Sequence, residues 1–331
     1  MNSLSYYTGT SLVISFFKKE AHMKQKAFCI STLVILLWAS ASWAISLVDA
    51  DWLKKNLDNK NVRIVEVPEK ADAVGDQHLP GKLHIHGAVV VNRYLDLGNL
   101  NVVPPTLYPS KEQYERLMSR LGITPDTTVV AYDDKFSLFA SRLLVIMELY
   151  GHDTNKLQLL NGGLVNWKKL GYPTLDGHIP VSATQYNAEK VTPILLTWSD
   201  IFRDVVSGAR PEVVLLDVRP PDEFSGKNIR TIRGGHIPHA INVTGTDANN
   251  KEDHTFKSAD EIRKLFEAKG ITSDKSIYEY CHSGDRTAHA YVILKYILGF
   301  KDVKVYDGSW IEWATLLSLP AEEQVWYTEK K

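Results

Sequence analysis

The chain has 331 residues, with 38 Lys and Arg against 39 Asp and Glu, and 44% of its residues are hydrophobic. This balance is that of an ordinary globular protein and excludes collagenous, disordered and disulfide-dense classes. The formal net charge of −1 gives no electrostatic reason to bind nucleic acid, so we expect no nucleic-acid partner. At about 150 residues per domain, the length allows two domains.

The first 44 residues are typical of a targeting segment. After Met23 come two lysines, then an uncharged and mostly apolar run over residues 27–38, then small residues up to Ala44. This is the order of a secretory signal peptide, and the run is shorter than the ~20 residues that span a bilayer, which makes a permanent anchor the weaker alternative. We expect residues 1–44 to be an upstream extension and a signal peptide cleaved after Ala44, and the protein to be periplasmic or secreted.

Cysteine usage singles out one thiol. Of the two cysteines, Cys29 lies in the signal segment, so Cys281 is alone in the remainder of the chain. An exported protein meets a compartment that favours disulfides, yet this chain cannot form one within itself. Cys281 is therefore either a small buried hydrophobic residue or a nucleophile.

An internal repeat sets the domain organisation. Identical residues recur 148 positions apart, at Ser110 and Ser258, Leu117 and Leu265, Gly122 and Gly270, Tyr132 and Tyr280, Ala140 and Ala288, and Gly151 and Gly299. The repeat predicts a tandem duplication. We expect a first domain over 45–178, a linker over 179–193, a second domain over 194–320 and a tail over 321–331.

Each half alternates short strands with helices. The strands are expected at 128–132 in the first half and at 213–216, 276–280 and 303–306 in the second. Capping boxes at 110–113 and 258–261 predict helix starts, and further helices are expected over 138–150 and 287–298. Short apolar strands joined by helices predict an α/β fold, with a mainly parallel sheet flanked by helices in each domain.

Cys281 lies between a predicted strand and a predicted helix, in the segment Tyr-Cys-His-Ser-Gly-Asp-Arg-Thr over residues 280–287. The carboxyl end of a parallel strand is where ligands bind. A tight loop at this place turns backbone N–H groups toward one point, which favours a thiolate and an anion, and Gly284 supplies the permissive backbone. The position favours a nucleophilic cysteine over a packed one.

These residues resemble the rhodanese family of sulfurtransferases, whose active loop has the form Cys-x-x-Gly-x-Arg or a close variant. The resemblance covers nearly the whole chain after residue 44, and its other motifs are Asp217-Val218-Arg219-Pro220, Gly235-His236-Ile237-Pro238 and Tyr306-Asp307-Gly308-Ser309-Trp310. It implies two tandem rhodanese-like domains of the thiosulfate or 3-mercaptopyruvate sulfurtransferase type, with the second domain catalytic.

The resemblance also implies roles for single residues. Cys281 is expected to be catalytic, taking sulfur from a small anionic donor as a persulfide and passing it to cyanide or a thiol, without a cofactor. The expected substrate-binding residues are Arg219, His282, Ser283, Gly284, Asp285 and Arg286. We expect thiosulfate as the donor, but 3-mercaptopyruvate remains open because the charge of Asp285 opposes a dianion. The physiological donor and acceptor and the oligomeric state are left open.

The first half departs from the pattern. The offset of 148 places Asp133 opposite Cys281 and Phe136 opposite Gly284, and Glu66-Val67-Pro68 stands where the second half has Asp217-Val218-Arg219. A carboxylate cannot carry a persulfide. We therefore expect the first domain to lack an anion cradle and to have a structural or interaction role.

Three other functions compete with sulfur transfer. Cysteine phosphatases and arsenate reductases place five residues between Cys and Arg, whereas residues 282–285 make four here, which favours sulfur over phosphate. A non-catalytic sulfur-binding module is the second alternative. Metal binding is the third, because His84-x-His86 and His236-x-x-His239 have usable spacings, but no further ligands complete a site and we expect no metal.

Overall fold

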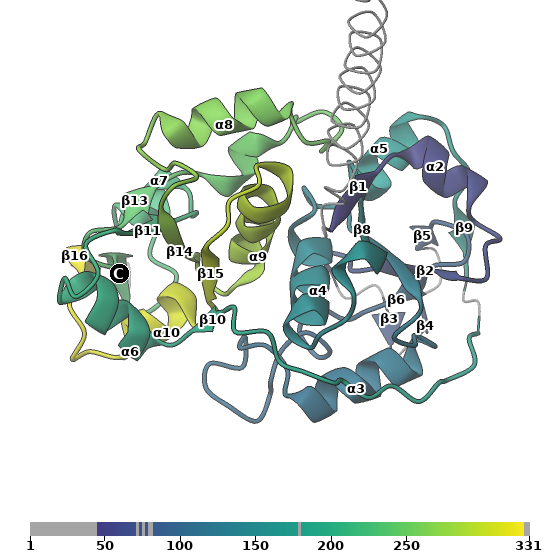
Figure 1. Ribbon diagram of the computed structural model, residues 1–331, viewed down its shortest axis with the longest axis horizontal. Coiled ribbons are helices and arrows are strands. Elements are labelled where there is room, and N and C mark those ends of the chain that lie inside the picture. Colours follow the sequence, from purple (N-terminus) through teal and green to yellow (C-terminus); the bar gives the residue numbers. More distant parts are fainter. Residues whose placement is uncertain (1–44, 71–72, 75–76, 79–81, 178–179, 328–331) are drawn as a thin grey trace, which may run out of the picture. The chain divides into compact units, whose positions relative to one another are not determined.

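Two five-stranded parallel sheets organise the part of the chain that the computed structural model describes, which is residues 45–70, 73–74, 77–78, 82–177 and 180–327 (Figure 1). These residues fall within one compact unit, 44–331. The predicted signal peptide, its cleavage site and Cys29 lie outside the described residues.

The first sheet has the order β1-β8-β7-β2-β6, and every neighbouring pair in it is parallel. Its strands are β1 (Ser46–Val48), β2 (Val62–Glu66), β6 (Val89–Val90), β7 (Thr128–Tyr132) and β8 (Leu157–Leu160). Its helices are α2 (Ala50–Lys55), α3 (Lys111–Arg120), α4 (Leu138–Leu149) and α5 (Gly163–Lys169), with a 3-10 turn over Thr154–Lys156. The parallel sheet with flanking helices that we predicted for this half is confirmed.

The second sheet repeats the plan, with the order β10-β15-β14-β11-β13 and parallel neighbours throughout. Its strands are β10 (Leu195–Leu196), β11 (Val213–Asp217), β13 (Ile241–Asn242), β14 (Ser276–Tyr280) and β15 (Val303–Tyr306). Its helices are α6 (Trp198–Ile201), α7 (Pro221–Phe224), α8 (Ala259–Glu267), α9 (Asp285–Tyr291) and α10 (Ser309–Thr315), with a 3-10 turn over Gly245–Ala248. The tandem α/β architecture is therefore confirmed.

Local sequence signals explain where several helices begin. The side chains of Ser110 and Ser258 each accept the backbone N–H of the third residue of the helix that follows. The side chains of those third residues, Gln113 and Glu261, accept the backbone N–H of the serine in turn. Both predicted capping boxes are confirmed. The helix predicted over 287–298 begins earlier, at Asp285, and after Tyr291 it continues as a π-helix over Val292–Ile297; Phe202–Val206 after α6 is π-helical too.

Three short antiparallel pairs lie outside the main sheets. They are β3 (Ala73–Val74) with β4 (Gln77–His78), β5 (Leu83–His84) with β9 (Leu175–Asp176), and β12 (Arg233–His236) with β16 (Glu322–Trp326). The last pair includes part of the segment over 321–331 that we expect to be a tail. The described part of that segment is a strand whose backbone pairs with β12, an interaction that the polar side chains of the segment do not signal.

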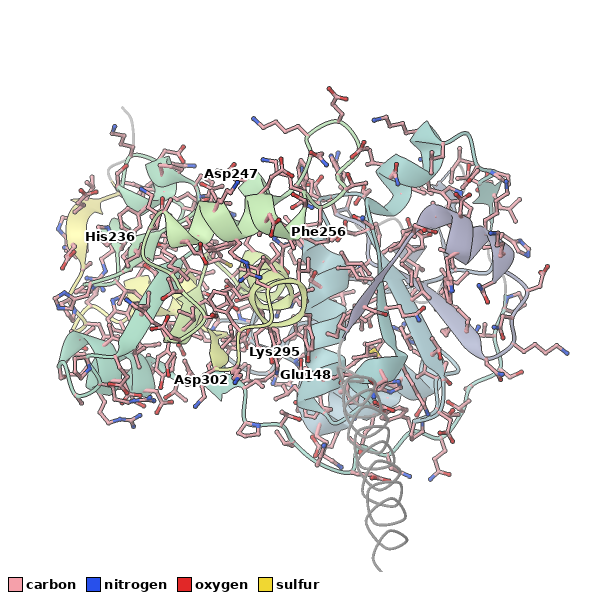
Figure 2. All side chains as sticks on the ribbon, turned by 45° about the horizontal axis from the view of Figure 1, so that its top comes forward. Glu148, His236, Asp247, Phe256, Lys295 and Asp302 are labelled. Carbon is pink, nitrogen blue, oxygen red and sulfur yellow. The ribbon has the colours of Figure 1, made fainter. Side chains whose placement is uncertain are left out.

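The two halves pack through α4 and α9, which share one buried apolar cluster. Within it, the Glu148 carboxylate of α4 lies 2.6 Å from the Lys295 ammonium and accepts the Tyr291 hydroxyl at 3.0 Å (Figure 2). The amino end of α9 directly follows the segment that contains Cys281, so this interface brings the first half close to that cysteine. Within the described residues, no helix combines the length and the apolar character needed to cross a membrane.

Candidate active site

Cys281 directly follows β14, and the loop of residues 281–286, here called the Cys281 loop, leads into α9. The thiol is buried, with 1% of the residue exposed. The backbone N–H of Gly284 donates to the Cys281 sulfur at 3.1 Å. Gly284 has φ of 91°, in the left-handed region that favours glycine, so its identity permits the turn that aims this N–H at the sulfur.

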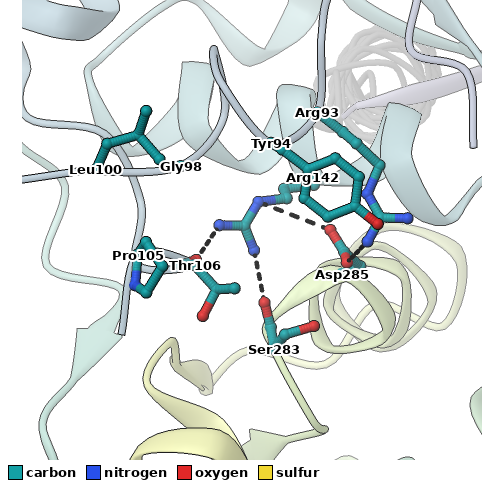
Figure 3. Close-up of a pocket in the computed structure, with 9 residues that line it drawn as sticks. All are labelled: Arg93, Tyr94, Gly98, Leu100, Pro105, Thr106, Arg142, Ser283 and Asp285. Atoms are coloured by element: carbon teal, nitrogen blue, oxygen red, sulfur yellow. Dashed lines mark hydrogen bonds and ion pairs between the residues drawn. The ribbon is translucent and has the colours of Figure 1, made fainter. Parts of the chain in front are cut away.

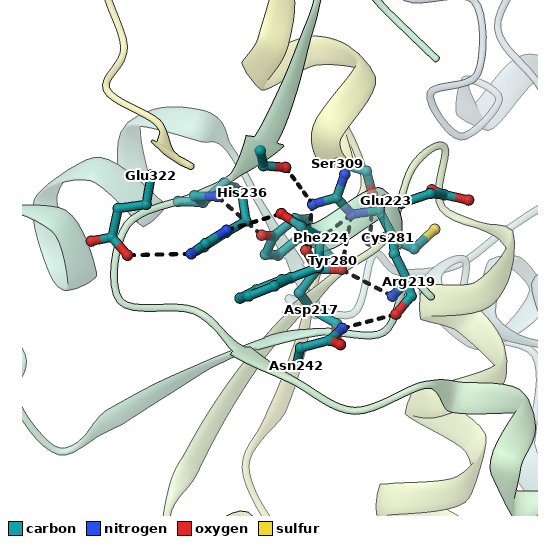
Figure 4. Close-up of polar contacts among 12 residues, drawn as sticks. Asp217, Arg219, Glu223, Phe224, His236, Asn242, Tyr280, Cys281, Ser309 and Glu322 are labelled. Atoms are coloured by element: carbon teal, nitrogen blue, oxygen red, sulfur yellow. Dashed lines mark hydrogen bonds and ion pairs between the residues drawn. The ribbon is translucent and has the colours of Figure 1, made fainter. Parts of the chain in front are cut away.

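The start of α10 holds the loop from the other side. The Cys281 N–H donates to the Ser309 hydroxyl at 3.2 Å, and that hydroxyl donates to the Tyr306 carbonyl at 3.0 Å (Figure 4). The Trp310 N–H donates in turn to the Cys281 carbonyl at 3.0 Å. These bonds hold the peptide units on both sides of the Cys281 Cα and so fix the position of its side chain.

Arg219 lies beneath this loop and is committed to protein partners. It is 1% exposed, and its Nη2 donates to Asp217 at 2.6 Å and to the Gly235 carbonyl at 2.9 Å (Figure 4). Asp217 is fully buried and also accepts the Arg219 N–H at 2.9 Å. The guanidinium also packs 4.8 Å from the Trp310 ring, so Arg219 is held on several sides by its own domain.

Arg286 is also paired. Its guanidinium forms two hydrogen bonds to the Glu223 carboxylate, at 3.0 and 2.9 Å, and Arg230 reaches the same carboxylate at 3.2 Å. The side chains of Arg286 and Glu223 are 16% and 6% exposed. The positive charge of Arg286, which we predicted to bind an anionic donor, is thus partly balanced by the Glu223 carboxylate.

The remaining predicted residues differ in their surroundings: His282 is buried, whereas Ser283 and Asp285 contact arginines of the first half. His282 is buried, and burial lowers its pKa to about 3, so its imidazole is neutral near pH 7. Asp285 forms an ion pair with Arg93 at 2.8 Å and lies 3.8 Å from Arg142. The Ser283 carbonyl accepts from Arg142 Nη1 at 3.1 Å.

A pocket opens beside Ser283 and Asp285 (Figure 3). Ser283 and Asp285 line it from the second half, and the first half contributes Arg93, Tyr94, Gly98, Leu100, Pro105, Thr106 and Arg142. Sequence reasoning missed Arg93 and Arg142. One signal was available, because Arg142 and Glu148 are the two charged residues of the otherwise mostly apolar helix α4, and such residues are buried only with partners.

The first half keeps a related loop and fills it from within. The Asp133 carboxylate accepts four backbone N–H groups at 2.8 to 3.0 Å, from Lys135, Ser137, Phe139 and Ala140. Burial raises the pKa of Asp133 to about 6, and these hydrogen bonds act in the opposite direction. The expectation that this loop lacks an anion cradle is therefore wrong, because the cradle is present and holds the loop's own side chain.

Phe136 explains how this cradle survives without glycine. Its φ is 56°, so the backbone adopts the left-handed region despite the side chain. Its ring lies 3.8 Å from the His254 ring, centroid to centroid, and its N–H donates to His254 Nδ1 at 3.3 Å. Contacts from the second half thus cover the first-half loop and offset the strain.

The chain matches the model of the rhodanese-like domain over residues 49–170 and 207–316. It belongs to the rhodanese-like domain family. Each matched segment falls in one half of the repeat and contains four of the five strands of that half's sheet.

Named proteins of similar sequence extend this result. Sulfur carrier protein TtuD of Thermus thermophilus is 34% identical over 287 residues, which cover 83% of this chain and 95% of TtuD. A Mycobacterium tuberculosis protein named "Putative thiosulfate sulfurtransferase" is 36% identical over 286 residues, with 83% and 97% covered. Among solved structures, the 3-mercaptopyruvate sulfurtransferase SseA of Escherichia coli matches with a TM-score of 0.69 and 25% identity, covering 81% of this chain and 99% of SseA.

The two rhodanese-like domains differ in what their loops offer. In the second, a thiol stands at the strand end with one N–H on its sulfur, and in the first, a carboxylate stands there with four N–H groups on its oxygens. Within the described ranges, no group of three or more His, Cys, Asp and Glu side chains is placed to hold a metal ion.

Proposed function

We propose that this rhodanese-like protein is a sulfurtransferase that moves the outer sulfur of thiosulfate to a thiophilic acceptor through a persulfide on Cys281. The observation that carries the proposal is the hydrogen bond from the Gly284 N–H to the Cys281 sulfur, in a strand-to-helix loop beside a pocket. A backbone N–H aimed at the sulfur stabilises negative charge on it, as the N–H groups of an oxyanion hole do on oxygen. Relatives named for thiosulfate sulfurtransferase activity and for sulfur carriage support the same chemistry.

The proposed reaction has two steps. The Cys281 thiolate attacks the outer sulfur of thiosulfate, the sulfur–sulfur bond of the donor breaks, and sulfite leaves with the electron pair. Cyanide or a thiolate then attacks the outer sulfur of the persulfide, and Cys281 returns as a thiolate. This sequence predicts ping-pong kinetics, and it needs no cofactor because the sulfur itself is the group carried.

3-Mercaptopyruvate is the second candidate donor. Two observations favour it, namely the likeness to SseA and the carboxylate of Asp285 on the pocket wall, which opposes a dianion more than a monoanion. Arg93 and Arg142 on the same wall act in the opposite sense. Comparison of kcat/KM for the two donors decides between them, and a tenfold preference for mercaptopyruvate, about 1.4 kcal/mol, would overturn the choice of thiosulfate.

Replacement of the nucleophile tests the function. Cys281→Ser exchanges one small side chain for another, so the protein should stay folded while transfer from thiosulfate to cyanide falls to background. The intact mass of the parent protein should increase by one sulfur after treatment with thiosulfate, and that of the variant should not. Turnover retained by Cys281→Ser would overturn the mechanism.

Hydrolysis of an aryl phosphate separates the rival classes. A phosphatase-like enzyme would hydrolyse it, whereas a sulfurtransferase would transfer sulfur and leave the ester intact. A non-catalytic sulfur-binding module would become persulfidated without turnover. The commitment of Arg286 to Glu223 supports the sulfurtransferase, because a phosphatase needs that guanidinium for the phosphate oxygens.

Export completes the proposal and rests on the sequence of residues 1–44. Expression of the full chain should give a periplasmic protein whose N-terminus, read by peptide mapping, follows Ala44. Recovery from membranes alone, or a mature N-terminus upstream of residue 27, would contradict it.

A further inference from the structure

Arg142 of the first domain makes an unusual set of contacts with the second. Its side chain is 3% exposed and donates to the carbonyls of Thr106 at 2.5 Å and Ser283 at 3.1 Å (Figure 3). It also donates to the Leu97 carbonyl at 2.9 Å. It also lies 3.9 Å from the Asp307 carboxylate, and its guanidinium packs 4.5 Å from the Tyr108 ring. A buried cation with three carbonyl partners is held in one place, and only one of these carbonyls belongs to the Cys281 loop.

The carbonyl that Arg142 binds belongs to the same peptide unit as the N–H on the sulfur. The C=O of Ser283 and the N–H of Gly284 are joined by one planar bond, so in the trans form they point in opposite directions. Arg142 holds the oxygen at 3.1 Å, and the N–H at the other end lies 3.1 Å from the Cys281 sulfur. A cation on the carbonyl also polarises the peptide and makes its N–H a stronger donor.

The fit at this peptide is close. A Cβ built on Gly284 would lie 2.4 Å from Arg142 Nη1 and 3.0 Å from an Asp307 oxygen. Arg142 and Gly284 are thus in direct contact across the two domains. The absence of a side chain at Gly284 allows the guanidinium to reach the loop at all.

We propose that Arg142 is a positioning residue of the Cys281 site: through the Ser283–Gly284 peptide it aims and strengthens the N–H that stabilises negative charge on the sulfur. The inference deepens the proposed function and rests on it. It gives the first domain a specific part in catalysis, although that domain lost its own cysteine. In this role the residue acts on the sulfur through the peptide.

The pH dependence of Cys281 alkylation tests this role without any sulfur donor. In Arg142→Met, the N–H is less well aimed and less polarised, so the alkylation rate near pH 7 should fall about three- to tenfold, while the plateau at high pH stays equal or rises slightly. Arg142→Lys keeps the charge but loses the planar guanidinium, so its alkylation rate near pH 7 should lie between those of the parent protein and Arg142→Met. An alkylation profile that matches the parent's in Arg142→Met would overturn the proposal.

Lys295→Met is the matched control, because it breaks the ion pair that Glu148 of α4 makes with Lys295 at 2.6 Å, away from the Cys281 loop. If Arg142 only docked the domains, both variants would change alike, at every pH, and the proposal would be wrong. If Arg142→Met does not fold, Arg142→Lys alone must show the shift relative to Lys295→Met, and an unshifted profile in Arg142→Lys would then overturn the proposal.

Other groups around the sulfur must be held constant in this comparison. Those that interact electrostatically with Cys281 are Glu279 on β14, Arg286 on α9 and Tyr108 before α3, and Asp307 after β15 lies beside Gly284. Burial raises the pKa of Asp307 to about 7, and Arg142 opposes that rise, so the measurement is repeated in an Asp307→Asn background. The same downward change there supports the role, and its disappearance would assign the effect to Asp307 and overturn the proposal.

The two proposals fail in different ways. A parent protein that transfers no sulfur, with an alkylation profile that depends on Arg142, would contradict the proposed function alone. A protein that transfers sulfur, with a profile independent of Arg142, would contradict this inference alone.

Discussion

Arg286 and Glu223 form a two-point ion pair beside the nucleophile, with both guanidinium-to-carboxylate distances near 3 Å, at 3.0 and 2.9 Å. Both side chains are largely buried, and burial of a charge is costly unless the partner is present. The pair therefore ties α7 to the start of α9, and its electrostatic effect on a donor is that of a dipole more than of a free cation.

We expect the main effect of Arg286→Met to be a loss of fold stability, with a smaller effect on the binding of the sulfur donor. Loss of the guanidinium leaves Glu223 with Arg230 as its remaining cation, and the free energy of unfolding should fall by about 1–3 kcal/mol. Adding Glu223→Gln should restore part of this loss, which denaturant unfolding of the double variant measures. Additive losses in the double variant would show that the pair is not coupled.

Asp285 is expected to limit the affinity for thiosulfate. Its carboxylate occupies Arg93 and lies close to Arg142, so Asp285→Ala should free positive charge on the pocket wall. We expect the KM for thiosulfate to fall roughly three- to tenfold at low salt and less at high salt. Mercaptopyruvate is the control, since a monoanion should respond less. An unchanged KM for both donors would place Asp285 outside the donor's path.

His282 should not act as a cation. Burial lowers its pKa to about 3, so the ring is neutral well below pH 7 and gains its proton only in acid. Transfer by His282→Gln should therefore keep the parent's pH profile between about pH 6 and 9. Loss of an inflection near pH 6.5 in this variant would show that the native imidazole titrates at its ordinary pKa.

Asp133→Cys in a Cys281→Ser background should not create an active site. The four N–H groups that now bind the carboxylate would lose their acceptor, and Phe136 with His254 would still cover the loop. We expect transfer at background level and a lower melting temperature than in Cys281→Ser alone. Turnover near that of the parent would contradict the structural role of the first domain.

The sequence predicts the repeated α/β plan well because its signals are local. The capping box of Ser258 and Glu261 involves a few neighbouring residues, and the short apolar strands are equally self-contained. The strand-to-helix setting of Cys281 follows from the same signals. Fold and nucleophile could therefore be predicted together.

The partners of the charged residues could not be predicted in this way. Arg142 and Ser283 are 141 positions apart, and their contact exists only because α4 and α9 pack against each other. Nor does the sequence distinguish a guanidinium that faces a ligand from one that is paired, as Arg219 is with Asp217 two residues earlier. The sequence shows the sign and number of the charged residues, but it does not show which of them are paired in the folded protein.

The Asp133 carboxylate, held by four N–H groups, has a consequence for how the two loops behave over a catalytic cycle. The first loop holds its own side chain through these four N–H groups at every stage of the cycle. The second holds one sulfur, that of Cys281, between turnovers and a second, outer sulfur only while loaded, so its order should rise and fall with turnover. Amide hydrogen exchange would record this as protection of residues 282–286 that appears with the persulfide and is lost on discharge, beside a first-domain loop whose exchange never changes.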